Sequence, residues 1–118
     1  MVPTAEPVRP SVSQFTSIAA EALCHCKDVA LREAIEDIRD PLVRVASSGN
    51  HDGRRHVHEG KLFSAAIALY DAYLNSRPTQ VETAIVRRAL EVVLSEFQSP
   101  PYREGITARL HGILASKA

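Results

Sequence analysis

Apolar residues that recur once per helical turn between residues 61 and 97 constrain the fold of this chain more than any other feature of its sequence. In "KLFSAAIALYDAYLN", residues 61–75, two neighbouring lines of apolar side chains follow the helical period: Leu62, Ala66, Leu69 and Tyr73, and beside them Phe63, Ile67, Tyr70 and Leu74. Such a wide apolar face predicts a central, heavily packed helix. No window alternates apolar and polar residues as a half-buried strand would, so the sequence predicts an all-α fold.

Capping residues and prolines divide the chain into successive helices. Ser11 with Gln14 and Thr79 with Glu82 have the spacing of capping boxes, which predicts helices that begin near residue 12 and just after Thr79. The pair of prolines at 100–101 predicts the start of a last helix, because proline is tolerated in a first helical turn.

Two boundaries in the first half of the chain are less simple. The apolar face changes direction near Lys27 and Asp28, so either a helix breaks there or one long helix meets different neighbours on its two halves. Asp40 before Pro41 has the pattern of an N-cap and a first helical residue, which predicts a short separate helix that ends near Gly49.

These segments predict a single-domain bundle of four to five helices in which neighbours are antiparallel, because the connections are short. The domain is expected to span residues 12–118. Residues 1–11 are expected to form a flexible, proline-rich leader, because Pro3, Pro7 and Pro10 disfavour both helix and central strand.

Composition excludes several classes of protein. The chain has 118 residues, 45% of them hydrophobic, which suits one soluble globular domain. Fourteen Lys and Arg balance fourteen Asp and Glu, so no overall field attracts nucleic acid, and no apolar run approaches membrane-spanning length. Two cysteines are too few for a disulfide framework, which favours a cytoplasmic location.

Enzymatic chemistry finds no support in the motifs. The chain has no glycine-rich phosphate loop, no nucleophile elbow and no His-Glu-x-x-His sequence, and the acidic residues at 33, 36, 37 and 40 indicate the outer face of an amphipathic helix. Nucleic acid binding would depend on two short arginine pairs, 54–55 and 87–88, which have acidic neighbours. We therefore expect a protein that is not an enzyme and binds no cofactor.

The polar interval "GNHDGRRHVHEG", residues 49–60, holds three histidines and suggests a zinc-binding helical regulator as one alternative. Its ligands would come from His51, His56 and His58 together with Cys24 or Cys26. The two cysteines would point about 200° apart on a helix, so at most one could join the histidines. The simpler interpretation, which we favour, is a hydrophilic connection without metal, whose histidines could respond to pH.

A second alternative comes from "HVHEGKLFSAA", which resembles the His-x-x-Lys-Gly signature of histidine phosphotransfer proteins. The resemblance implies a four-helix bundle in which His56 accepts the phosphoryl group and Gly60 leaves room beside it. Glu59 stands where that family has its lysine, and the preceding glycines indicate that His56 lies at a helix start.

The function we expect is that of a small adaptor, chaperone or regulatory module that acts through protein contacts and forms a homodimer. The reason is an apparent excess of apolar surface for so small a bundle, which a second chain would cover. The residues expected to contact the partner are Leu31, Ile35, Ile38, Leu90, Leu94 and Phe97.

Overall fold

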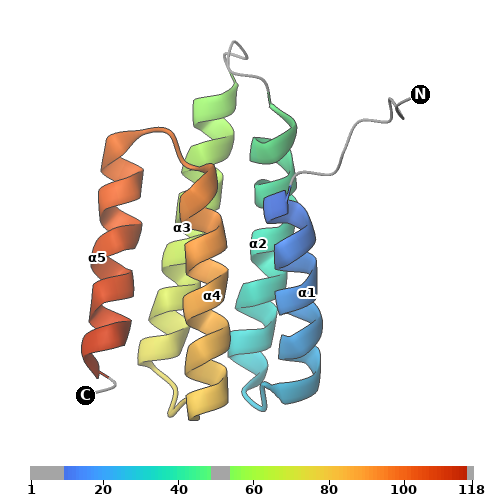
Figure 1. Cartoon of the computed structure of the whole chain (residues 1–118), viewed down its shortest axis with the longest axis vertical. Helices are drawn as coiled ribbons and strands as arrows, with labels where there is room; N and C mark the ends of the chain where they lie inside the picture. Colours follow the sequence, from blue (N-terminus) through green and yellow to red (C-terminus); the bar gives the residue numbers. More distant parts are fainter. Residues whose placement is uncertain (1–9, 49–53, 117–118) are drawn as a thin grey trace.

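A computed structural model describes residues 10–48 and 54–116 of the chain. Within these residues it contains no strand and five α-helices: α1 (Pro10–His25), α2 (Val29–Ser47), α3 (Arg55–Leu74), α4 (Gln80–Glu96) and α5 (Pro100–Ser116). Consecutive helices run in opposite directions (Figure 1). The predicted all-α bundle with antiparallel neighbours is therefore confirmed.

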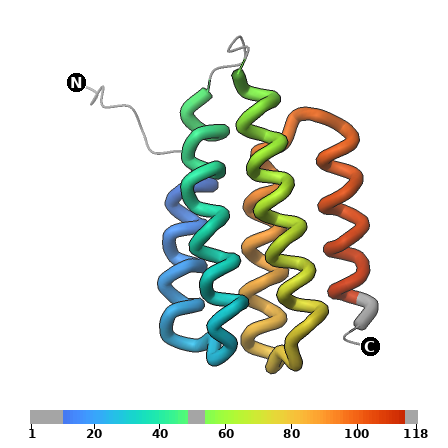
Figure 2. The backbone as a smooth tube through the Cα atoms, turned by 180° about the vertical axis from the view of Figure 1, so that it is seen from behind, coloured from blue at the N-terminus to red at the C-terminus, as the bar shows by residue number. Residues whose placement is uncertain are grey.

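Helices α1 to α4 form a four-helix arrangement, and α5 lies at its edge. Helix α2 packs on α3, and α1 packs on α4, so that the two pairs lie one behind the other (Figure 2). Of the described helices, α5 contacts only α3 and α4. Helix α1 therefore lies at the opposite edge of the molecule from α5 (Figure 1).

The core is filled by the apolar faces that the helical period predicts. The first line of α3 is buried throughout, since Leu62, Ala66 and Leu69 are 0% exposed and Tyr73 is 7% exposed. Every helix of the four-helix part has at least two neighbours in the same chain. Wide apolar faces are thus covered without a second molecule.

That coverage corrects the predicted partner surface. Five of its six residues lie in the core with exposed fractions of 0 to 2%: Leu31, Ile35, Ile38, Leu90 and Phe97. The sixth, Leu94, is half-buried against that core. The prediction that the five buried side chains contact a partner is wrong, and for half-buried Leu94 it stays a prediction. What the sequence presented as an excess of apolar surface is the packing between α2 and α4 and their neighbours.

Two helix boundaries differ from expectation. The helix is interrupted between His25 and Val29. Of the two alternatives for the change of apolar face, a helix break is therefore the one that the structure shows. The short helix predicted at Pro41 is wrong, because α2 runs through Pro41 without interruption while Leu42 and Val45 continue its buried face. The missing amide of a proline removes one helical hydrogen bond, and burial along the same face outweighs that loss.

The remaining boundaries agree more closely. Helix α1 begins at Pro10, two residues before the expected position, and residues 1–9 of the predicted leader lie outside the described residues. Helix α4 begins with the predicted capping box of Thr79 and Glu82, in which both reciprocal hydrogen bonds are present. The predicted cap Gly49 lies outside the described residues, and the described cap of α2 is Ser48.

Helices α3 and α5 meet through glycines that lie against aromatic rings. The three contacts keep one register along the two parallel helices: Gly60 with Tyr102, Gly105 with Phe63, and Gly112 with Tyr70. A methyl group added at Gly105 would lie 2.9 Å from the ring of Phe63. These small residues therefore let α5 approach α3 closely, which side chains of ordinary size would prevent.

Candidate functional site

The polar interval around residue 55 contains a buried ion pair. We expected residues 49–60 to form a connection, but α3 already begins at Arg55. Arg55 is 6% exposed and Glu59 is 2% exposed, and Nε of Arg55 donates to Glu59 Oε2 over 3.1 Å. The pair is one helical turn apart, so both groups lie on the inward face of α3.

Arg55 also holds the ends of two other helices. Its Nη1 donates to the carbonyl oxygens of Val45 and Ser48, at 3.0 and 3.1 Å, and its Nη2 donates to the carbonyl of Glu96 at 2.8 Å. These carbonyls belong to the C-terminal ends of α2 and α4, where helices leave acceptors unsatisfied. The guanidinium therefore supplies hydrogen-bond donors to carbonyls at the C-terminal ends of two helices, and one of them, Val45 O, also accepts from the amide of Ser48.

Two carboxylates complete this cluster at one end of the bundle. Glu96 lies 3.8 Å from Arg55 Nη2 and accepts a hydrogen bond from the hydroxyl of Ser11 in α1. Glu59 also accepts from the backbone amide of Gln98, at 3.2 Å. The donors and acceptors of the cluster join α1, α2, α3 and α4 to one another, so its role is to hold the fold together. The sequence signal that could have indicated this cluster is the i, i+4 spacing of Arg55 and Glu59.

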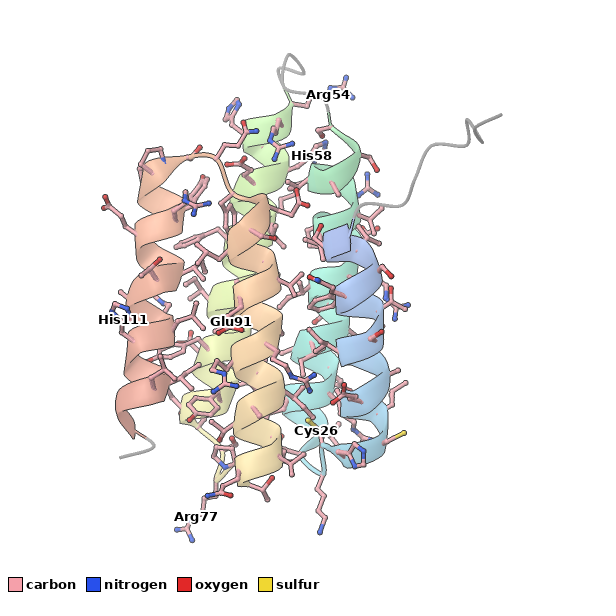
Figure 3. The ribbon with its side chains drawn as sticks, viewed as in Figure 1. Cys26, Arg54, His58, Arg77, Glu91 and His111 are labelled. Carbon is pink, nitrogen blue, oxygen red and sulfur yellow. The ribbon has the colours of Figure 1, made fainter. Side chains whose placement is uncertain are left out.

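The candidate zinc ligands are not brought together. Cys26 lies at the end of the bundle where α1 meets α2, and His58 lies at the opposite end (Figure 3). Among residues 10–48 and 54–116, no group of three His, Cys, Asp or Glu side chains could hold a metal ion. The predicted ligand His51 lies outside the described residues.

His56, the alternative phosphoacceptor, is exposed in the first turn of α3, in agreement with the expected helix start. Glu59, the residue in place of the family's lysine, is buried and paired with Arg55. No described cation therefore faces His56 from that position. The phosphotransfer hypothesis stays a prediction, and no contact favours it.

Apolar side chains that remain exposed lie elsewhere than predicted. Of the large hydrophobic residues in the described part of the chain, seven are more than a third exposed: Leu23, Val29, Val43, Val57, Leu74, Val81 and Leu114. Leu23 is 60% exposed and Val29 is 52% exposed, and these two line the same groove.

The groove lies between the C-terminal end of α1 and the first half of α2, with a volume of about 470 Å³, and we call it the α1–α2 groove. Its lining consists of Leu23 from α1 and five residues from α2: Val29, Arg32, Glu33, Glu36 and Asp37. All three carboxylates are exposed. The groove thus combines two apolar side chains with an acidic wall.

The turn that forms one end of this groove is fixed by Glu82 of α4. The carboxylate of Glu82 accepts hydrogen bonds from the backbone amides of Lys27, at 2.7 Å, and Asp28, at 3.3 Å. Burial opposes ionisation of Glu82, but these amides and that of Thr79 stabilise its charge and hold its pKa below the usual value. Asp28 then caps α2 by accepting from the amide of Leu31. The position of Val29 is therefore set by buried contacts.

Cys26, at the start of the same turn, is buried in the core. It is 4% exposed and part of the core, and burial raises the pKa of its thiol. Cys24, two residues earlier, is exposed. The two thiols therefore differ in environment as the helical geometry predicted.

A second groove, between α1 and α4, has a volume of about 410 Å³ but a different character. Its apolar lining residues Ile18 and Val92 are only 4% and 8% exposed. Arg88 on its rim donates to Glu21 at 3.1 Å, and this hydrogen bond lowers the pKa of Glu21. Its charge is balanced and it offers no exposed apolar side chain, so the α1–α2 groove is the stronger candidate for binding.

No helix among the described residues is long and apolar enough to cross a membrane. Comparison of the chain with models of known protein families, with curated proteins and with solved structures gives no match.

Proposed function

We propose that this protein is a non-enzymatic interaction module that binds a segment of a partner protein in the α1–α2 groove. The observation that carries the proposal is the exposure of Leu23 and Val29 side by side in one groove. A groove that combines exposed apolar side chains with charged groups around them has the composition of a protein-binding surface. The roles of adaptor, chaperone and regulator all remain within this proposal.

The size of the groove predicts a weak contact unless the partner also reaches beyond it. Full burial of a Leu or Val side chain contributes about 1.5 to 3 kcal/mol. With Leu23 60% and Val29 52% exposed, covering both contributes about 2 to 3 kcal/mol in total. Association costs more than this in lost translational and rotational freedom, so the neighbouring charges have to contribute as well.

The partner in this proposal is a different protein and not a second copy of the chain. The expected homodimer depended on apolar residues that lie in the core of one chain. In the α1–α2 groove the two exposed apolar side chains lie beside three carboxylates and one guanidinium, so two copies joined groove to groove would bring their acidic walls together and repel each other.

Site-specific crosslinking tests the proposal. A photoreactive benzoylphenylalanine is placed at Leu23 and, separately, at Val29, and the chain is irradiated in its native host. The matched control is Val43, which is 37% exposed on α2 but does not line the groove. We expect the same second protein in the products from Leu23 and Val29, and not in those from Val43.

The captured protein must then bind the purified chain, and Leu23→Glu must weaken that binding. If both groove positions yield no product, or the same products as Val43, the proposal is wrong. A product of two copies of this 12.9 kDa chain would replace it with self-association.

A further inference from the structure

The lining residues of the α1–α2 groove follow an order along α2 that defines a direction. Val29, Glu33, Glu36 and Asp37 recur at intervals that place them on one face of the helix. The eight helical steps from Val29 to Asp37 span about 12 Å at the helical rise of 1.5 Å per residue. The groove is therefore apolar at the turn between α1 and α2 and acidic two helical turns further along.

The acidic part of the groove carries an excess of negative charge. Three carboxylates face it, against the single guanidinium of Arg32. Glu36 lies 3.5 Å from Arg39, but both side chains are more than 40% exposed, so this surface pair contributes little and leaves the carboxylate available. Lys27 and His25 lie near the turn, on the apolar side, and neither lines the groove.

Given the proposed function, on which this inference rests, we propose that the partner's segment is a basic amphipathic helix. Its apolar side chains cover Leu23 and Val29, and its Lys or Arg side chains, one to two turns further along, face Glu33 and Asp37. A helix fits because a groove between two helices admits the ridge of a third. Opposite charges along the acidic wall also fix which way the helix runs.

Designed peptides test this inference on the full purified chain. The probe is a fluorescein-labelled amphipathic helix of about four turns, with Leu at i and i+4 at one end and Lys along the same face. The comparison peptide has the same apolar residues and Glu in place of every Lys. Binding is measured by fluorescence anisotropy at low and high salt.

We expect the basic peptide to bind at least about tenfold more tightly than the acidic one, and to weaken by a similar factor in high salt. The double variant Glu33→Lys, Asp37→Lys should reverse the preference. Glu91→Lys is the matched control, since Glu91 is 55% exposed but lies in the groove between α1 and α4. This variant should leave the affinities of both peptides unchanged.

Three outcomes would overturn the inference: equal binding of both peptides, no binding of either, or an equal effect of Glu91→Lys. These failures differ from failure of the proposed function. A partner captured at Leu23 but insensitive to Glu33→Lys, Asp37→Lys would leave the groove as a binding site and remove only the basic partner.

Discussion

Replacement of Arg55 by methionine should destabilise the fold more than any substitution of an exposed residue. The change keeps an unbranched apolar stem and removes the guanidinium with its charge and donors, so Glu59 and Glu96 lose their buried counter-ion. Removing one partner of a buried ion pair costs about 3 to 5 kcal/mol. Loss of the three hydrogen bonds that Arg55 donates to backbone carbonyls adds about 1 kcal/mol or more in total, because Val45 O keeps its bond from the amide of Ser48. A total of about 4 kcal/mol or more approaches the whole stability of many domains.

The assay is guanidinium chloride unfolding at pH 7 followed by circular dichroism, with thermal unfolding as a second readout. A loss of about 4 kcal/mol corresponds to a fall in Tm of about 15 °C for a domain of this size. Arg39→Met is the control, because Arg39 forms an exposed pair with Glu36 and its loss should cost under about 1 kcal/mol.

A second variant separates lost charge balance from lost packing. Adding Glu59→Gln to Arg55→Met removes one uncompensated carboxylate and should recover part of the stability. If Arg55→Met unfolds with the same free energy as Arg39→Met, the buried cluster does not hold these helices together and the reasoning fails.

Three further predictions concern other parts of the fold. Gly105→Ala should destabilise by about 1 kcal/mol despite its better helix propensity, because the new methyl group meets the ring of Phe63; an increase in Tm would contradict this. Because folding lowers the pKa of Glu82, Glu82→Gln should cost stability near pH 7, with the deficit shrinking as the pH falls through that lowered pKa; a pH-independent deficit would contradict this. A thiol reagent should label Cys24 in the native protein, and buried Cys26 only after unfolding.

Much of the fold could be predicted because local signals decide it. The capping box of Thr79 and Glu82 and the period of Leu62, Ala66 and Leu69 depend only on residues within a turn or two of each other. The helix start predicted at Pro41 was wrong for a different reason. Proline disfavours a helix interior locally, but burial of the residues on both sides of Pro41 keeps α2 continuous, and that burial depends on the whole bundle.

The candidate site could not be predicted for a related reason. Which apolar residue stays exposed depends on how many neighbours each helix has, and periodicity places Leu31 and Leu23 alike on apolar faces. Helix α2 packs against α1, α3 and α4, and Leu31 on its inner face is 0% exposed, whereas α1 packs, among the described helices, only against α2 and α4, and Leu23 is 60% exposed. The acidic residues of α2 were correctly expected on the outer face, and only their place beside Leu23 required the structure.

The most direct test of binding in the α1–α2 groove is chemical-shift mapping of the ¹⁵N-labelled chain during titration with the basic amphipathic peptide. We expect the shifted amides to cluster between residues 22 and 38, with those of α5 unchanged. Shifts centred on α4 or α5, or none at saturating peptide, would contradict it.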